Sequence, residues 1–464
     1  MAYVKPQLDL LSAGEDVKTD DRTNAVQKGK SIAECLAAHN ISVEPDGFKE
    51  SPINMVFDYR LKAGTRYKDV LSIVTEISVA VGSDVKIFHD NEDGNVFSVS
   101  VPHPCRDIVT LRQILESYQY LDHSSPLTIA VGIDDRGRNV CFDLCEAPHL
   151  LISGTTGSGK TVFLDDVILS ILYKASPNDV RLVLIDPEGN DFKLYDTIPH
   201  LMFPVVTEKA KAVEVVKYVR NQMNKRFDSF AEVGVKNIEA YNSNAAYPLP
   251  RIVIVIDKYM EMTYEVPEDF EDCLEEIARK GRAAGVHIII NTQTARSDVV
   301  SSDLKFNIKY RAAFSVTDWH ESKAILDKTG AQKLLGNGDM YLTFGQDDSI
   351  LHVQAANVTE DEVRKIVQKI IADNGTADFV GKLDYEKKDL NEDEQYIRKI
   401  LLSVSNTKSI SVFTIQKTLG VGFSEASDII KFLEEKKVIS SFAIGKGRTV
   451  DQDRIDELLG KYQI

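Results

Sequence analysis

A glycine-rich segment with one lysine, in the first half of the chain, has the composition of a phosphate-binding loop. An apolar run over 149–153 leads into it and a helical run follows it; the segment reads Gly154, Thr155, Thr156, Gly157, Ser158, Gly159, Lys160 and Thr161. Glycines let backbone N–H groups turn inward around phosphates, the lysine reaches the β- and γ-phosphates, and the threonine hydroxyl is a ligand for Mg²⁺. Between a strand and a helix, this spacing predicts a P-loop that binds ATP and Mg²⁺.

A carboxylate ends a second apolar run, over 251–256. Asp257 follows this run directly, in the position from which an aspartate orients Mg²⁺ beside a P-loop, although an aspartate that caps the next helix is the structural alternative. Lys258 comes next, where such ATPases usually carry the glutamate that polarises the attacking water. The general base is therefore absent from its expected place.

The elements that must position these residues follow Pro148, where buried strands alternate with helices. This alternation is typical of a parallel sheet covered on both faces. The expected strands are 149–153, 180–185, 252–256, 287–291 and 312–315, and the longest helical runs are 210–231 and 268–285. We predict an α/β P-loop NTPase core.

Composition and periodicity divide the chain into five segments. Residues 1–30 are polar without sustained periodicity, which predicts a flexible arm. Residues 31–147 combine an amphipathic helix with alternating strands and predict a small α+β domain. The P-loop core occupies 148–372, a charged linker 373–390, and a last unit of helices and short strands 391–464.

The overall charge limits how the protein binds nucleic acid. The 464 residues carry a net charge of −16, so any contact with nucleic acid must be local. No apolar run approaches the length of a membrane span, and the N-terminus lacks the pattern of a signal peptide. Five cysteines without the spacing of a zinc site suggest reduced thiols. We therefore expect a cytoplasmic protein without a membrane segment in this chain.

Several ordered blocks resemble the FtsK/SpoIIIE family of DNA translocases. They include the run from Pro148 into the P-loop, Leu184 to Pro187, Ile198 to Leu201, Gly234 to Asn237 with Tyr241 and Asn242, Lys280 to His287, and Ile325 to Asp327 with Leu334 to Met340. The resemblance implies a ring-forming α domain, a RecA-like β motor domain and a winged-helix γ domain at the C-terminus. It also implies a ring, typically a homo-hexamer, that moves double-stranded DNA with ATP.

The same resemblance implies roles for further motor residues. Arg282 matches the arginine finger that reaches a neighbouring subunit's γ-phosphate, and Gln293 matches the polar sensor of that phosphate. A surface arginine and a buried glutamine bonded to backbone are the alternatives. Lys236 and Arg226 are candidate cations of the DNA channel or of an interface, or ordinary solvated residues.

Two charges are exchanged relative to the family pattern, which reads Asp-Pro-Lys after the second strand and Asp-Glu after the third. Here the chain has Asp186-Pro187-Glu188 and Asp257-Lys258. Our hypothesis is a compensating exchange in which Glu188 is the general base and Lys258 supplies the lost cation. The competing hypothesis is that Lys258 prevents hydrolysis; Glu261, one helical turn on, is a weaker candidate base.

The last unit departs from the family at the start of its recognition helix. Related γ domains place Asn and Arg there, whereas Ser424, Glu425 and Asp428 stand here, and carboxylates cannot pair with guanine edges as guanidinium groups do. Residues 391–464 carry 11 basic and 11 acidic side chains. We expect either altered DNA contacts led by Lys446 and Arg448 in the wing, or a protein partner.

The sequence therefore predicts an ATP-driven ring translocase of double-stranded DNA. A ring that binds ATP without hydrolysing it, acting as a clamp or regulator on DNA, is the first alternative because of Lys258. A secretion ATPase that moves protein substrates is the second, although those usually carry tandem motor domains.

Overall fold

The computed structural model divides into two compact units, Met1–Val380 and Gly381–Ile464. It describes the following residues: 3–14, 21–50, 54–89, 94–103, 108–263, 269–344, 350–380, 400–401, 404, 409–419, 423–440, 448–451 and 454–455.

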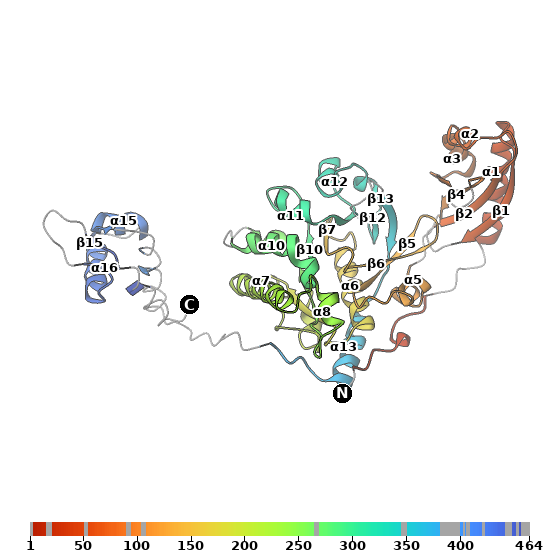
Figure 1. Cartoon of the computed structure of the whole chain (residues 1–464). Coiled ribbons are helices and arrows are strands. Elements are labelled where there is room, and N and C mark those ends of the chain that lie inside the picture. Colours follow the sequence, from red (N-terminus) through yellow and green to blue (C-terminus); the bar gives the residue numbers. More distant parts are fainter. Residues whose placement is uncertain are drawn as a thin grey trace. The chain divides into compact units, whose positions relative to one another are not determined.

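The first unit contains a small antiparallel sheet with helices packed against it (Figure 1). Its strand order is β1-β2-β4-β3, with β1 Val43–Glu50, β2 Asn54–Leu61, β3 Lys86–His89 and β4 Val96–Pro102. The accompanying helices are α1 Asp21–Ala38, α2 Tyr67–Leu71 and α3 Val74–Val81. Apolar side chains from α1 and α3, such as Ile32, Leu36 and Ile77, are fully buried against Met55 and Phe97 of the strands. This core makes the small sheet a hydrophobic unit of its own.

A nine-stranded sheet dominates the remaining described part of this unit. Its order is β6-β5-β13-β12-β11-β7-β10-β9-β8. The bounds are β5 Thr128–Asp134, β6 Asn139–Asp143, β7 His149–Ser153, β8 Val180–Ile185, β9 Arg251–Ile256, β10 Val286–Thr292, β11 Tyr310–Phe314, β12 Asp339–Phe344 and β13 Ile350–Ala355. All five strands expected after Pro148 are present within one or two residues. The P-loop strand β7 lies between β10 and β11, inside the sheet.

The prediction of a parallel sheet is correct for one half of this sheet and wrong for the other. Strands β8, β9, β10, β7 and β11 are parallel. Strands β12, β13, β5 and β6 are antiparallel to their neighbours. For the pairs β12/β13 and β5/β6 the physical reason is a short connection, which can only return the chain antiparallel.

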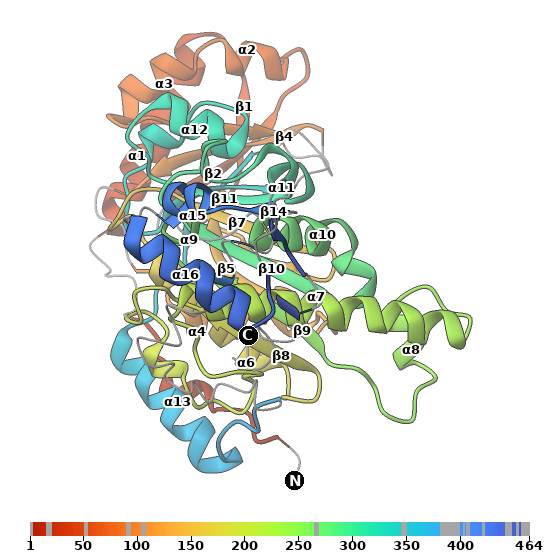
Figure 2. The ribbon, with the colours of Figure 1, turned by 90° about the vertical axis from the view of Figure 1, so that its left-hand side faces the viewer.

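Helices cover both faces of the large sheet. In Figure 1, α6 lies on one side and α10 and α11 lie on the other. Figure 2 shows α7 projecting past the sheet with α8 at its outer end. The bounds are α4 Leu111–Leu115, α5 Tyr118–Leu121, α6 Lys160–Lys174, α7 Lys209–Glu232, α8 Ile238–Asn242, α9 Tyr259–Thr263, α10 Asp269–Ala284, α11 Ser302–Asn307, α12 Trp319–Leu326 and α13 Glu360–Asn374, with 3₁₀ turns η1 Leu8–Leu10, η2 Lys193–Tyr195 and η3 Ala331–Lys333.

The boundary that we expected at residue 147 falls inside this sheet, because β5 and β6 belong to it. β5 packs on α6, and the amide of Ala130 donates to the Ser170 hydroxyl at 3.0 Å. Most of α6 is consequently buried, including Val167, Ile168 and Leu172. Residues 128–143 therefore complete the core around the P-loop helix, and assigning them to the preceding domain was wrong.

The expectation of a flexible arm over 1–30 is also wrong for the residues described there. The Tyr3 hydroxyl donates to the Leu172 carbonyl at 3.0 Å, and the Ser12 amide donates to Glu362 at 2.6 Å. Leu11 is only 3% exposed, and α1 already begins at Asp21. The sequence did not indicate this packing, because the segment is extended apart from the turn Leu8–Leu10 and so has no periodic apolar pattern.

The second unit has a small core of its own. Helical residues 400, 401 and 404 precede α15 Val412–Leu419 and α16 Phe423–Glu435, and the short strands β14 Ser409–Ile410 and β15 Arg448–Thr449 pair antiparallel. Leu401, Ala426, Leu433 and Val438 are buried. Residues 441–447 of the expected wing lie outside the described residues, as does the linker from 381 on, so the winged helix stays a prediction.

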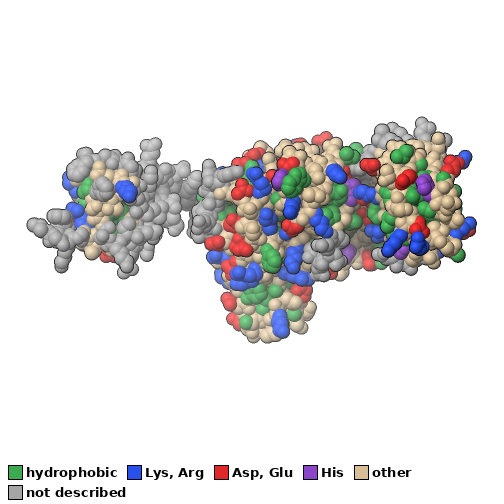
Figure 3. All heavy atoms as spheres, turned by 90° about the horizontal axis from the view of Figure 1, so that it is seen from above, with side chains coloured by type: hydrophobic (Ala, Val, Ile, Leu, Met, Phe, Trp, Pro, Cys, Tyr) green, Lys and Arg blue, Asp and Glu red, His purple; other side chains and the backbone are tan. Residues whose placement is uncertain are grey.

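Charges of both signs are interspersed over the described surface seen in Figure 3. No helix among the described residues is both long enough and apolar enough to cross a membrane. Cys35, Cys141, Cys145 and Cys273, the cysteines within the described ranges, are free thiols.

Two histidines buried at the amino edge of the sheet predict a loss of stability in acid. Burial lowers the pKa of His149 and of His287 to about 3, whereas the unfolded chain takes up these protons near pH 6.5. Stability is therefore full above pH 6.5 and is lost as the pH falls toward 3. At pH 5 each histidine costs about 2 kcal/mol.

We expect urea unfolding at pH 8, 6.5 and 5 to show this loss, and the double variant His149→Asn/His287→Asn to show a flatter profile despite lower stability at pH 8. The exposed His123→Asn is the control and should keep the wild-type profile. Parallel profiles for the double variant and wild type would contradict the assignment.

Candidate functional site

The P-loop adopts a conformation that depends on its glycines. Gly154, Gly157 and Gly159 have φ angles of 156°, 78° and 111°, a region that side-chain-bearing residues avoid. The loop continues directly from β7, and α6 begins at Lys160. The first amides of α6 therefore lie beside the loop, as a phosphate site requires.

Gly159 permits a close approach between the P-loop and a second turn. The Gly338 amide donates to the Ser158 carbonyl at 2.9 Å. A Cβ on Gly159 would lie 2.6 Å from the nitrogen of Gly338, which cannot move cheaply because it is backbone. The turn 336–338 before β12 is thereby fixed as one wall of the site.

Lys160 is buried at the base of the loop. Its Nζ donates to the carbonyls of Gly154 and Thr155 at 2.6 and 2.8 Å. Burial lowers the pKa of Lys160 to about 8, against the opposing effect of Asp257. An anionic phosphate at the loop would stabilise the charged amine, so the residues present suit a nucleotide.

Asp257 lies at the carboxyl end of β9 and is 1% exposed. Its Oδ1 accepts hydrogen bonds from Asn291 and from the Lys258 amide, while its buried Oδ2 has no hydrogen-bond partner among the described atoms. Burial, followed by the neighbouring Asp191, raises the pKa of Asp257 to about 7. Carboxylate oxygens of Asp186, Asp191 and Asp257 lie within 4.8 Å of one another. Mg²⁺ prefers such hard oxygen ligands, so the site fits the ion that the P-loop implies.

Lys258 and Glu188, the two residues of the expected charge exchange, are in direct contact. Lys258 Nζ lies 2.6 Å from Glu188 Oε2 and 2.5 Å from Asp191 Oδ2. Burial alone would lower the pKa of Lys258, but the hydrogen bonds with Asp191 and Glu188 outweigh it and raise the pKa above its usual range. Lys258 also has a φ of 50°. The two strand ends thus present opposite charges to each other.

One cavity of about 350 Å³ brings most of these residues together. Its lining consists of Thr156, Gly157, Gly159, Lys160, Thr161, Val162, Asp257, Lys258, Asn291, Thr292, Gln293, Asn337, Gly338, Ala355, Ala356 and Asn357. Of the predicted motor residues, Gln293 is in this lining, whereas Glu188 and Arg282 are not.

Arg282 lies at the opposite edge of the sheet. It is an exposed residue in the last turn of α10, just before β10 begins. The seven residues of β10 separate it from Gln293, roughly 20 Å at the usual rise of a strand. Arg282 is therefore positioned away from the P-loop of the same chain.

The predicted DNA-contacting cations differ in exposure and in their contacts. Lys236 is exposed in the connection between α7 and α8, which lies at the outer end of their projection (Figure 2). Arg226 is buried and donates to the carbonyls of Ala284 and Pro250 at 2.7 Å each. The interpretations of Arg226 as a channel cation, an interface cation or a solvated residue are therefore wrong. Arg448 pairs with Glu434, and Lys446 lies outside the described residues.

Sequence reasoning missed several polar residues of the site, among them the following three. Asn291 holds Asp257, Asp191 binds Lys258, and Asn337 helps to line the cavity. The sequence did indicate Asn291 as a site residue, because it is a polar residue at the carboxyl end of an apolar strand. Asp191 and Asn337 lie in loops, where residue type alone gives no direction.

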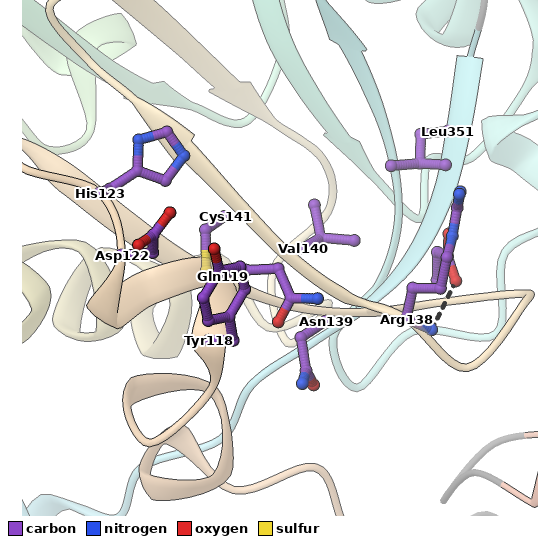
Figure 4. A pocket seen from close by; sticks show the side chains of 10 residues that line it. Tyr118, Gln119, Asp122, His123, Arg138, Asn139, Val140, Cys141 and Leu351 are labelled. Carbon is purple, nitrogen blue, oxygen red and sulfur yellow. Dashed lines mark hydrogen bonds and ion pairs between the residues drawn. The ribbon is translucent and has the colours of Figure 1, made fainter.

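A second cavity of about 480 Å³ lies beside α5 and β6 (Figure 4). Tyr118, Asp122, His123 and Cys141 are among its lining residues, and Arg138 is paired with Asp134. None of the predicted site residues lines it. The smaller cavity at the P-loop is the candidate functional site because the phosphate-binding chemistry is there.

Comparison with known families identifies two matching segments. The sequence model of the FtsK/SpoIIIE family matches residues 110–297, and that of the FtsK alpha domain matches residues 5–103. The first match begins ahead of β5, in agreement with the position of β5 and β6 in the large sheet.

Similar curated proteins are DNA translocases. FtsK of Clostridium acetobutylicum is 32% identical over 98% of this chain and 61% of its own length. FtsK of Caldanaerobacter subterraneus is 33% identical over 100% of this chain and 66% of its own length. SpoIIIE of Bacillus subtilis is 30% identical over 98% of this chain and 60% of its own length. The chain thus spans about three fifths to two thirds of these relatives.

One similar solved structure is the conjugation coupling protein TcpA of pCW3, in a monomer form with ATPγS. It is 21% identical, the match covers 74% of this chain and 99% of TcpA, and the TM-score is 0.53. At this identity the likeness concerns the fold alone.

The contact between Gly159 and Gly338 makes the Gly159→Ala variant a test of the pocket. We expect this variant to weaken binding of a fluorescent ATP analogue at least about 100-fold, because both the positive φ and the backbone of Gly338 oppose a Cβ. Gly157→Ala is the matched control, since a Cβ there meets nothing within 4 Å. It should weaken binding only about tenfold, through its positive φ. Equal losses would show that the Gly338 contact is unimportant.

Proposed function

The chain belongs to the FtsK/SpoIIIE family, and from this premise we propose that it is an ATP-driven translocase of double-stranded DNA that works as a homo-hexameric ring. The observation that carries the proposal is the single cavity in which Lys160, Thr161 and Asp257 meet. The relatives named DNA translocases support the choice of substrate.

The chain's own residues would hold ATP and Mg²⁺ in the following way. The loop from Gly154 to Gly159 and the first amides of α6 hold the phosphates, and Lys160 turns from its carbonyl partners toward their charge. Thr161 and Asp257 hold Mg²⁺, and Asn291 fixes one oxygen of Asp257 so that the unpartnered one faces the site. Bound Mg²⁺ would neutralise charge that develops on the phosphates.

Glu188 is the general base in this proposal and Lys258 its charge partner. The ion pair at 2.6 Å supports a compensating exchange, because each residue occupies the strand end where the family carries the other. Glu188 is 47% exposed, and it must leave Lys258 to take a proton from water. Lys258 lines the cavity and would then add a cation near the phosphates.

Arg282 and Gln293 complete the motor in the proposal. Gln293 lines the cavity and senses the terminal phosphate. Arg282, at the far edge of the sheet, serves the pocket of the next subunit in the ring, where its guanidinium stabilises charge in the transition state. A ring is then needed for hydrolysis, because each pocket lacks its own finger.

DNA binding is proposed to be local and mediated by phosphate contacts. Lys236, exposed beyond α7, is the candidate cation on the first unit. We also propose that the second unit is a winged helix that contacts DNA through Lys446 and Arg448 or binds a protein partner. A cytoplasmic location is proposed on the free thiols of the described cysteines.

A clamp that binds ATP without hydrolysing it is the second candidate function. The observation that favours it is the close pairing of Lys258 with both Glu188 and Asp191. If this pairing persists with nucleotide bound, no carboxylate is released to act as a base.

Steady-state ATP hydrolysis with long double-stranded DNA tests the base. We expect DNA to stimulate wild-type turnover and Glu188→Gln to lower kcat at least about 100-fold, the usual contribution of a general base. The charge-exchanged double variant Glu188→Lys/Lys258→Glu should recover activity relative to Glu188→Lys, because the ion pair is retained in reverse. Glu261→Gln is the matched control, since Glu261 does not line the cavity.

Two results would change the assignment. Loss of activity in Glu261→Gln but not in Glu188→Gln would move the base to α9. A wild type that binds ATP without turnover, together with an active Lys258→Glu variant, would establish the clamp and reject the exchange.

Mixing two inactive variants tests whether Arg282 acts across subunits. The Arg282→Ala variant keeps an intact nucleotide pocket but lacks the arginine finger, and the Lys160→Ala variant keeps the finger but lacks an intact pocket. Each variant alone should lose about 1,000-fold in kcat. Mixed rings contain interfaces where an intact Arg282 faces an intact Lys160, and these should restore hydrolysis in proportion to their number. Mixtures no more active than the sum of their components would place Arg282 outside catalysis.

A further inference from the structure

A chain of four ionisable side chains runs from the small N-terminal sheet to the wall of the nucleotide cavity. Lys86 begins β3 of the small sheet, Asp135 follows β5, His352 lies in β13, and Asp339 begins β12. Lys86 Nζ is 2.5 Å from Asp135 Oδ2. His352 Nδ1 is 2.7 Å from Asp135 Oδ1, and its Nε2 is 2.6 Å from Asp339 Oδ1. These four residues are called the Lys86–Asp339 chain below.

The three members of the chain other than Lys86 are largely shielded from water. Asp135 is 8% exposed and Asp339 is 2% exposed, and the His352 side chain is 14% exposed. Burial alone would lower the pKa of His352, but hydrogen bonds with Asp135 and Asp339 outweigh it and raise the pKa above its usual range. Interactions between charges are stronger and less screened in such surroundings than at the surface.

His352 joins both ends of the chain in either protonation state. With both nitrogens protonated, it donates to Asp339 and to Asp135. With Nδ1 unprotonated, Nε2–H still donates to Asp339 while Nδ1 accepts from Lys86 Nζ, which lies 2.7 Å away. The groups facing the ring are Asp135, Asp339 and Lys86, together with the Tyr341 ring at 5.1 Å.

At one end the chain reaches the turn that touches the P-loop. Asp339 Oδ2 accepts from the Leu335 amide at 2.9 Å, and the Asp339 amide donates to Gly336, so this residue fixes both arms of the turn 335–339. Gly338 in the same turn donates to the Ser158 carbonyl, and Asn337 and Gly338 line the nucleotide cavity.

At the other end, three strands of the small sheet converge on Asp135. Besides Lys86 of β3, Asn54 of β2 donates to the Asp135 carbonyl at 3.2 Å, and Ser100 of β4 donates to it at 2.8 Å. The Arg136 guanidinium lies 4.8 Å from the Phe88 ring. The loop after β5 is therefore the place where the two sheets are joined by polar contacts.

We propose that the Lys86–Asp339 chain couples the position of the small N-terminal sheet to the Asn337–Gly338 wall of the nucleotide cavity, with His352 as a positioning residue. When the small sheet shifts, Lys86 moves with it and displaces Asp135 and His352. The hydrogen bond from His352 then displaces Asp339, and with it the turn 335–339. The inference rests on the proposed function only in taking the cavity as a nucleotide site.

The test is amide hydrogen exchange of residues 336–339 in the nucleotide-free full chain. Lys86→Met removes the far end of the chain without touching the cavity, and we expect it to speed exchange of these amides about fivefold, a usual size for coupling between residues in one network. Lys86→Arg should restore wild-type exchange, because it keeps the cation. Lys62→Met is the matched control, since Lys62 follows β2 of the same sheet and pairs with Glu44.

Affinity for a fluorescent ATP analogue with Mg²⁺ gives a second readout. Lys86→Met and His352→Gln should each weaken binding about fivefold, and the double variant should be no weaker than either one. Lys86 is 45% exposed, so its variant folds even if His352→Gln does not.

Two outcomes would overturn the proposal: exchange at 336–339 that is the same in Lys86→Met and Lys62→Met, or fully additive losses of affinity. Complete failure of the wild type to bind the analogue would overturn the nucleotide function instead. The exchange comparison, made without nucleotide, would still decide the proposal.

Discussion

A single backbone hydrogen bond, from the Gly338 amide to the Ser158 carbonyl, is the constraint on which the nucleotide cavity depends. It joins two segments that are 180 residues apart in sequence, and it forms because Gly159 carries no side chain, since a Cβ there would lie 2.6 Å from the Gly338 nitrogen. The P-loop thereby gains a wall from the antiparallel half of the sheet, while β7, β9 and β10 supply its floor from the parallel half. The two halves must be correctly joined by the pairing of β11 with β12 before a phosphate meets a complete site.

The exchange of charges between Glu188 and Lys258 is best understood from the geometry of neighbouring parallel strands. Since β8 and β9 are paired and end at the same edge, residues just beyond them face each other. An ion pair between those positions keeps its attraction when its members are swapped, so the structural cost of the exchange is small. In the proposed mechanism the chemical cost differs, because only the glutamate can accept a proton from water and it would act from β8 rather than from β9. Selection for stability alone would therefore leave either arrangement intact.

The sequence predicted the parallel strands, the P-loop and the position of Asp257 because each has a strong local signal: an apolar run, a glycine pattern or a terminal carboxylate. It did not predict that β5 and β6 complete the same sheet, because pairing over more than 200 residues leaves no local trace. The packed segment 3–14 was missed for a similar reason, since an extended chain has no periodicity. Arg226 looked like a surface cation, but its guanidinium satisfies two buried carbonyls. Asn291 could have been found by asking why a polar residue ends a buried strand.

The order of strands in the large sheet has a consequence for synthesis on the ribosome. The small sheet uses only residues between 43 and 102 and can form as soon as they emerge. β5, in contrast, pairs with β13, whose last residue is Ala355, so the edge of β5 has no partner until more than 200 further residues have been made. Non-local pairing of this kind is slow, and an unpaired strand edge is prone to aggregate with other chains. Until translation passes residue 355, early packing of β5 on α6 can hold this strand in place while its edge stays unpaired.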